Sequence, residues 1–155
     1  MSDYSGPGLY EIIPQHAQKM SVNVWGGATT AGTEVKLYDR TPTAKNTHFE
    51  IVAAGGTSAK PEIGDREYHI IAGNSGLYLA CDDADKITVQ LRAPLDASIR
   101  WKLAHVGNGA FCINSVNGKK QLNVRGAGKE NGTEMIMYDM SPKSENAQFI
   151  LKAVV

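Results

Sequence analysis

The sequence is poor in cysteine, with two in 155 residues. Small secreted domains that depend on disulfides for their stability carry many more cysteines for their length. Cys81 and Cys112 also fall at different places in the internal repeat of the chain, so they do not form a repeated pair. We therefore expect two buried, reduced thiols rather than a disulfide bond.

The chain also has no excess of charge of either sign, because 16 basic side chains balance 16 acidic ones. Nucleic acid and heparin require a surplus of Lys and Arg that displaces counterions, so neither is an expected partner. The uncharged stretches are too polar for a membrane helix, and no membrane insertion is expected. Residues 1–8 have neither the basic start nor the apolar run of a secretory signal. These features predict a protein that is cytoplasmic, or released without a conventional signal peptide.

The groups that carry most enzyme and metal chemistry are few and scattered. None of the four histidines stands in a His-x-x-x-His pattern, and the cysteines do not form a metal-binding pair. Neither cysteine has the context of a catalytic nucleophile. The stretch Gly126-Ala127-Gly128-Lys129 lacks the order of a phosphate-binding loop. The sequence therefore predicts no catalytic activity, no metal and no cofactor.

What the chain does contain is an internal repeat. When the sequence is shifted by 100 residues, positions 23–49 match positions 123–149 without a gap. The matched residues include the pairs Asn23 and Asn123, Tyr38 and Tyr138, and Asn46 and Asn146. The separation leaves room for a middle copy, which ends on Trp101 as the outer copies end on Phe49 and Phe149. Three units of about 50 residues therefore fill the chain.

Each unit consists of short apolar runs, many of them alternating with polar residues, which is typical of β-strands. Gly, Asn, Asp, Ser and Pro lie between the runs and accept the φ angles of tight hairpins. About four strands per unit give about twelve strands, which favours a closed all-β architecture. We predict one domain, residues 1–155, with three pseudo-symmetric lobes at approximately 8–56, 66–106 and 109–155.

Each unit ends on an aromatic residue that follows a polar cluster. The clusters are Asn46-Thr47-His48-Phe49, Ser98-Ile99-Arg100-Trp101 and Asn146-Ala147-Gln148-Phe149. They resemble the repeated Asn-Gln-x-Trp cluster of the ricin-B-type lectins, although two tryptophans are Phe and the Gln is replaced in all three. Segments such as Gly8–Pro14 and Glu67–Ile71 are similar to small fungal agglutinins of this kind. The resemblance implies a β-trefoil lectin that is not an enzyme, is homodimeric, and binds galactose or N-acetylgalactosamine on glycoproteins or glycolipids.

The resemblance also implies a sugar site in lobe 1. A galactoside needs an aromatic platform for the apolar face of its ring and short polar groups for its hydroxyls. Tyr38 stands at the stacking position of the family, and Asn46 stands at the position of its second polar ligand. Asn23 stands where many relatives carry Asp, and this change leaves the exact sugar open because a neutral hydrogen bond is weaker than one to a carboxylate.

Three further residues complete the predicted lobe 1 site. Trp25 and Gly26 belong to the turn after Asn23, where backbone amides approach the sugar closely. Arg40 is placed to donate to a ring oxygen or to an N-acetyl carbonyl. Lys36 lies on the same strand as Tyr38, where it also fits a side chain that simply points to solvent.

The other two lobes differ from lobe 1. Lobe 3 keeps Asn123, Tyr138 and Asn146, which form either a second, weaker carbohydrate site or a relic of one. It replaces Trp25 by Arg125 and Arg40 by Met140. Lobe 2 is five or six residues shorter in the site region and has no aromatic at the Tyr38 position. We expect no sugar site there.

Two other interpretations stay open. In the first, Tyr38, Trp25 and the asparagines have only structural roles in strands and turns, and Arg40 is a solvated surface charge. In the second, the protein is a β-trefoil protease inhibitor that acts through the exposed loop Ala54–Asp65, where Lys60 precedes Pro61. The retained Asn23, Tyr38 and Asn46 favour a lectin, because an inhibitor has no need of them.

Overall fold

The computed structural model describes residues 2–55 and 66–155, and within them the chain forms twelve strands, four in each lobe. Lobe 1 contains β1 (Gly8–Pro14), β2 (Met20–Val24), β3 (Val35–Asp39) and β4 (His48–Gly55). Lobe 2 contains β5 (Glu67–Ala72), β6 (Tyr78–Cys81), β7 (Ile87–Gln90) and β8 (Trp101–His105). Lobe 3 contains β9 (Phe111–Ser115), β10 (Lys120–Val124), β11 (Met135–Asp139) and β12 (Phe149–Ala153). The predicted all-β, three-lobed β-trefoil is confirmed.

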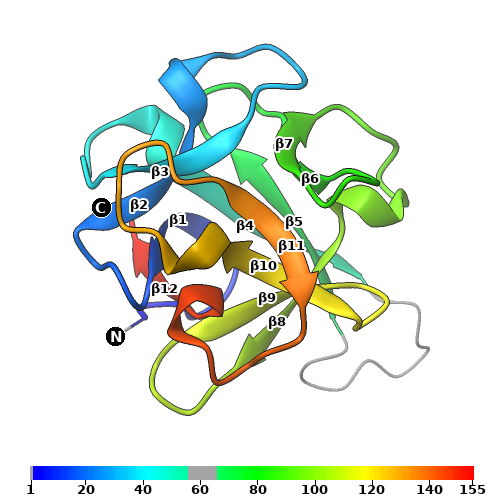
Figure 1. Ribbon diagram of the computed structural model, residues 1–155. Coiled ribbons are helices and arrows are strands. Elements are labelled where there is room, and N and C mark those ends of the chain that lie inside the picture. Colours follow the sequence, from blue (N-terminus) through cyan, green and yellow to red (C-terminus); the bar gives the residue numbers. More distant parts are fainter. Residues whose placement is uncertain (1, 56–65) are drawn as a thin grey trace.

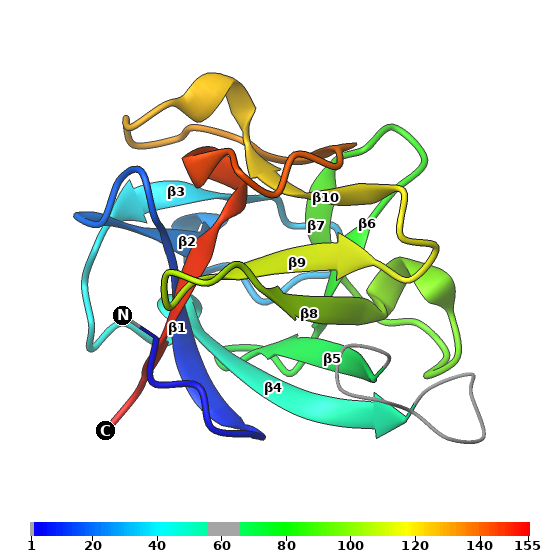
Figure 2. The same ribbon diagram turned by 90° about the horizontal axis from the view of Figure 1, so that it is seen from below.

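The first and last strands of each lobe form a closed barrel. Its antiparallel order is β12, β1, β4, β5, β8 and β9, and β9 pairs back to β12. A closed ring leaves no barrel strand with a free edge, which removes a site of aggregation. Figure 2 shows β1 and β12 side by side, with both chain ends at the same side of the barrel.

The remaining six strands form three hairpins, β2–β3, β6–β7 and β10–β11, arranged around one end of the barrel (Figure 1). Isolated bridges join neighbouring hairpins: Glu34 with Thr88, Lys36 with Glu134, and Lys86 with Ile136. These bridges define which residues are equivalent in the three lobes. By this register Tyr38 and Tyr138 of the outer lobes correspond to Gln90 of lobe 2.

The closing aromatics lie in the centre of the core. Phe49, Trp101 and Phe149 are all fully buried, as the sequence predicts. Trp101 keeps its polar atom satisfied, since its Nε1 donates to the carbonyl oxygen of Leu79 at 3.0 Å. Alternate residues of the barrel and hairpin strands add aliphatic side chains to the same core.

A short 3-10 turn precedes the closing strand of each lobe: η2 (Lys45–Thr47), η3 (Ala97–Ile99) and η5 (Glu145–Ala147). The residue after each turn donates to a proline carbonyl six residues earlier. His48 Nε2 contacts Pro42 O at 2.6 Å, Arg100 contacts Pro94 O at 2.6 Å, and Gln148 Nε2 contacts Pro142 O at 2.7 Å. Three different side chains therefore make the same contact, which holds the turns that carry Asn46 and Asn146.

Both cysteines are free, as predicted, although Cys81 is only partly buried whereas Cys112 is buried. Burial raises the pKa of both thiols, so they remain protonated near neutral pH.

No helix in the described residues is long and apolar enough to cross a membrane. The proposed inhibitory residues, Lys60 and Pro61, lie outside the residues that the structure describes.

Candidate functional site

Lobe 1 contains a cavity of about 330 Å³ on the outer face of the β2–β3 hairpin. It is lined by Asn23, Trp25, Gly26, Tyr38 and Asn46. These are five of the six residues that the sequence predicts for this site. The strand β2 carries Asn23, the turn η1 (Trp25–Gly27) carries the next two, β3 carries Tyr38, and η2 carries Asn46.

The structure does not place the sixth residue, Arg40, at this cavity. Its Nε and Nη2 donate to the Glu11 carboxylate at 3.1 and 2.9 Å, and this carboxylate is almost fully buried. The contact raises the pKa of Arg40 further above its usual range. The position of Arg40 has a physical reason: the buried Glu11 needs a cationic partner, and Arg40 supplies it.

Hydrogen bonds determine how the two lobe 1 asparagines present their amides. Asn23 Nδ2 donates to Ser21 O at 2.9 Å and to Ser21 Oγ at 3.0 Å, and Asn46 Nδ2 donates to Val24 O at 3.0 Å. A carbonyl oxygen can only accept, so the nitrogen of each amide must face it. Asn23 Oδ1 then faces Asn46 Nδ2 at 3.5 Å. The amides therefore offer oxygens, not nitrogens, to a ligand.

Two aromatic rings form the apolar wall of the lobe 1 cavity. Tyr38 is 45% exposed and Trp25 is 37% exposed, and their rings meet edge to face with centroids 6.0 Å apart. Lys36 Nζ lies 5.1 Å from the Trp25 ring centroid, and it also forms an ion pair with Glu34 at 3.1 Å. Lys36 therefore supports the Trp25 ring rather than simply extending into solvent.

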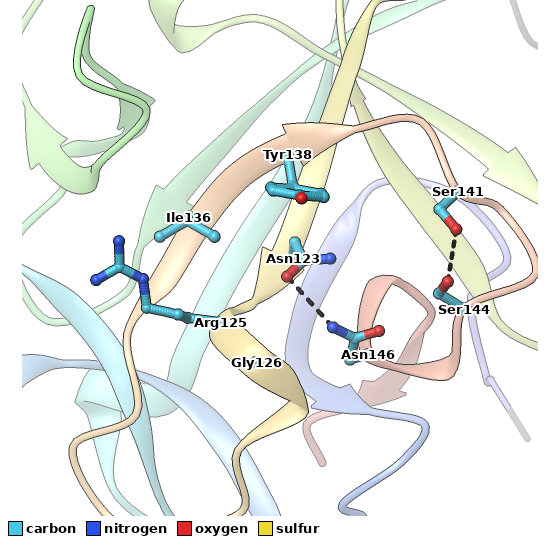
Figure 3. A pocket seen from close by; sticks show the side chains of 8 residues that line it. All are labelled: Asn123, Arg125, Gly126, Ile136, Tyr138, Ser141, Ser144 and Asn146. Carbon is cyan, nitrogen blue, oxygen red and sulfur yellow. Dashed lines mark hydrogen bonds between the residues drawn. The ribbon is translucent and has the colours of Figure 1, made fainter.

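Lobe 3 contains an equivalent cavity of about 400 Å³. Figure 3 shows Tyr138 above Asn123 and Asn146, with Arg125 on one side and the serines on the other. The lining residues are Asn123, Arg125, Gly126, Ile136, Tyr138, Ser141, Ser144 and Asn146. Asn146 Nδ2 donates to Val124 O at 3.0 Å and to Asn123 Oδ1 at 3.3 Å, as its counterpart does in lobe 1.

Comparison with known proteins places this geometry in a family. The family model of ricin-type β-trefoil lectin domain-like proteins matches residues 45–138, which is more than half of the chain. The chain belongs to this family. An agglutinin of Sclerotinia sclerotiorum is 29% identical over 142 residues, covering 86% of this chain and 88% of the relative.

Solved structures support the same fold. The designed threefold-symmetric protein ThreeFoil has a TM-score of 0.79 and 22% identity, covering 93% of this chain and 97% of its own. The C-half of an earthworm R-type lectin, in complex with GalNAc, has a TM-score of 0.69 and 18% identity, covering 94% of this chain and 98% of its own. At these identities the likeness shows the fold.

In this ricin-type trefoil, lobe 2 lacks the side chains that line the outer two cavities. The strand register places Ala80 and Gln90 where lobe 1 has Asn23 and Tyr38, and η3 carries Ser98 where η2 carries Asn46. The connection between β6 and β7 is also short, and it leaves out a turn equivalent to η1. Lobe 2 therefore presents neither the aromatic ring nor the pair of amides.

Contacts between lobes were not predicted. The Trp25 ring lies against Gly132 of lobe 3, where an added Cβ would be 3.6 Å from the ring. Asn131 Oδ1, also of lobe 3, accepts from the backbone N–H of Asp39 at 2.8 Å.

Ser141 and Ser144, which line the lobe 3 cavity, were missed because lobe 1 has Thr41 and Ala44 there. A comparison of repeats finds shared residues, so it overlooks residues that one lobe has gained.

Proposed function

We propose that this trefoil is a lectin for galactose- and N-acetylgalactosamine-type glycans and is not an enzyme. Lobe 1 is the principal site, and lobe 3 is a second, weaker one. The observation that carries the proposal is the lobe 1 cavity, which two asparagine side chains line together with an exposed tyrosine ring. Each part of that cavity matches one part of a galactoside.

The match is chemical. A galactoside has an apolar face of C–H groups, which the exposed ring of Tyr38 can cover, and the edge of Trp25 widens that surface. Its hydroxyls can donate to Asn23 Oδ1 and Asn46 Oδ1. The GalNAc complex of the earthworm R-type lectin supports this choice of sugar, because that protein shares the fold.

Two shallow sites on one chain also give the protein a way to bind strongly. A monosaccharide site of this kind reaches about millimolar affinity, or roughly −4 kcal/mol. Surfaces coated with glycans are bound far more tightly when several sites engage together. We propose a homodimer, which would present four sites, and sedimentation of the purified protein at micromolar concentration tests this assembly directly.

The test of the sugar function is a glycan array, followed by titration with free galactose and N-acetylgalactosamine. Tyr38→Ala and Asn46→Ala are expected to reduce galactoside binding by lobe 1 at least tenfold, since each removes a whole class of contact. Tyr38 is exposed and Asn46 is partly exposed, so circular dichroism should show folded variants. Full binding by a folded Tyr38→Ala, Tyr138→Ala double variant would refute the proposal.

A further inference from the structure

The two cavities differ in the hydrogen-bonding groups that they present. In lobe 1, Asn23 Nδ2 donates to the carbonyl oxygen and to the hydroxyl oxygen of Ser21. Lobe 3 has Gln121 in place of Ser21, at the same register opposite the tyrosine. Among the residues that the structure describes, Asn123 Nδ2 has no hydrogen-bond partner, and it is not sealed from solvent. Asn123 therefore keeps free N–H donors that Asn23 lacks.

The side chain of Gln121 accounts for the loss of one of these contacts, the one with the Ser21 hydroxyl. Its side chain is fully buried, and both its Oε1 and its Nε2 lack a partner within the described part of the chain. Residues 121 and 123 of β10 point to the same face of the strand, as residues 21 and 23 of β2 do. The longer side chain replaces the small hydroxyl that binds Asn23, and it makes no equivalent contact with Asn123.

The serine pair adds a second donor on the same side of the lobe 3 cavity. Ser141 Oγ and Ser144 Oγ lie 2.5 Å apart, so one hydroxyl donates to the other and the second hydrogen stays free. Figure 3 shows the Asn123 nitrogen turned toward this pair, away from Arg125. Lobe 1 has no such donor, because Thr41 Oγ1 donates to Asp39 O at 3.2 Å and Ala44 has no hydroxyl.

We propose that the two cavities select opposite groups on the glycan. Lobe 1 recognises hydroxyls that donate to amide oxygens. Lobe 3 recognises an oxygen that only accepts, the carbonyl of an acetamido group or a carboxylate, held between Asn123 Nδ2 and the free serine hydroxyl. This inference rests on the proposed lectin function and assigns a different glycan class to each site. One chain would then bridge two kinds of glycan rather than two copies of one.

The test isolates each site and then varies one sugar substituent. Tyr38→Ala leaves lobe 3 to report alone, and Tyr138→Ala leaves lobe 1. Each protein is titrated by calorimetry with methyl galactoside, methyl N-acetylgalactosaminide and methyl galacturonoside. The Tyr38→Ala protein is expected to bind one of the last two about tenfold more tightly than the galactoside. The Tyr138→Ala protein should show no such preference.

Two variants in the Tyr38→Ala background assign the preference to its donors. Asn123→Asp keeps the oxygen that faces Asn146 but replaces the donor by an acceptor, so the preference should be lost. Ser144→Ala recreates the lobe 1 residue in a partly buried turn, and it should reduce the preference even if Asn123→Asp does not fold. The two substituted sugars also identify the group that lobe 3 binds. The N-acetylgalactosaminide should bind best if that group is an acetamide, and the galacturonoside should bind best if it is a carboxylate.

The outcomes distinguish this inference from the proposed function. If the Tyr38→Ala protein binds all three sugars equally or binds none, while Tyr138→Ala binds galactoside, the inference is overturned and the lectin function stands. An unchanged preference in both Asn123→Asp and Ser144→Ala also overturns it. If neither single-site protein nor the wild type binds any sugar, the lectin function itself fails.

Discussion

At the scale of single residues, the lobes show how the same position is filled in two ways. Lobe 1 pairs the buried Glu11 with Arg40, whereas lobe 3 has Cys112 and Met140 at the equivalent positions. A charged pair has become a pair of soft, apolar side chains. Arg40 therefore neutralises Glu11, and we expect the aromatic and amide groups of the cavity to act independently of it.

The variant Arg40→Met tests this role. It leaves the Glu11 carboxylate buried without its cation, so we expect a loss of about 1–3 kcal/mol in the free energy of unfolding, measured with urea. The double variant Glu11→Cys, Arg40→Met copies lobe 3 and should recover most of that loss. Galactoside affinity should stay within twofold of the wild type. A large loss of affinity in a folded Arg40→Met protein would return Arg40 to the sugar site.

Gln121 allows a second prediction at this scale. Its buried amide has two polar atoms without partners among the described residues, and each such atom costs about 1–3 kcal/mol. Gln121→Met keeps the length of the side chain and removes both atoms. We expect it to raise the melting temperature by several degrees, measured by calorimetry without ligand. Ser21→Met at the matched position should instead lower it, because it removes an acceptor for Asn23.

At the scale of elements, the tight turns after β2 and β10 differ in the residue that adopts a positive φ angle. The η1 turn has Gly27 at φ 67°, whereas the equivalent turn η4 (Arg125–Ala127) has Ala127 at φ 54°. Residues with a Cβ atom have a higher energy than glycine in this left-handed region. Lobe 3 therefore holds its turn, and the wall of its cavity, in a strained backbone that lobe 1 avoids.

Reciprocal substitutions measure that strain. Ala127→Gly should stabilise the protein by about 0.5–1 kcal/mol, and Gly27→Ala should destabilise it by about 1 kcal/mol. Space is not the issue in lobe 1, since a Cβ at Gly27 would meet Asn46 Nδ2 only at 4.0 Å. Chemical denaturation of both single variants provides the comparison. Equal and opposite shifts are expected, and stabilisation by Gly27→Ala would contradict the interpretation.

At the scale of the whole molecule, the three lobes meet through their hairpins. Glu34 of lobe 1 forms ion pairs with Lys86 of lobe 2 and with Lys36 of its own lobe. These contacts lower the pKa of the Glu34 carboxyl below its ordinary value near 4.5, and the contact with Lys86 has the largest effect. The charged form is thus favoured by folding, and its contribution is present above that ordinary value and lost as the pH falls through the lowered pKa.

Glu34→Gln should reveal this dependence. At pH 7 we expect the melting temperature to fall by on the order of 1–2 °C, because the pair is partly exposed and such pairs contribute little. As the pH falls through the lowered pKa the wild-type carboxyl is protonated too, and the two melting temperatures should converge. Glu134→Gln is the matched control, since Glu134 pairs with the exposed Arg125 of its own lobe. A difference that persists in acid would exclude the ion pairs as its cause.

The sequence by itself determined the β-trefoil, its three lobes, the buried closing aromatics and the group of Asn23, Tyr38 and Asn46. The three lobes and the closing aromatics follow from spacing along the chain, which a repeat records directly, whereas the β-trefoil and the site residues follow from the resemblance to ricin-B-type lectins. The tertiary structure alone decided that Arg40 binds Glu11, that Trp25 lies on Gly132 of another lobe, and that Gln121 leaves Asn123 free to donate. Such partners are distant in sequence, and they meet only because strand register and barrel closure bring particular side chains together.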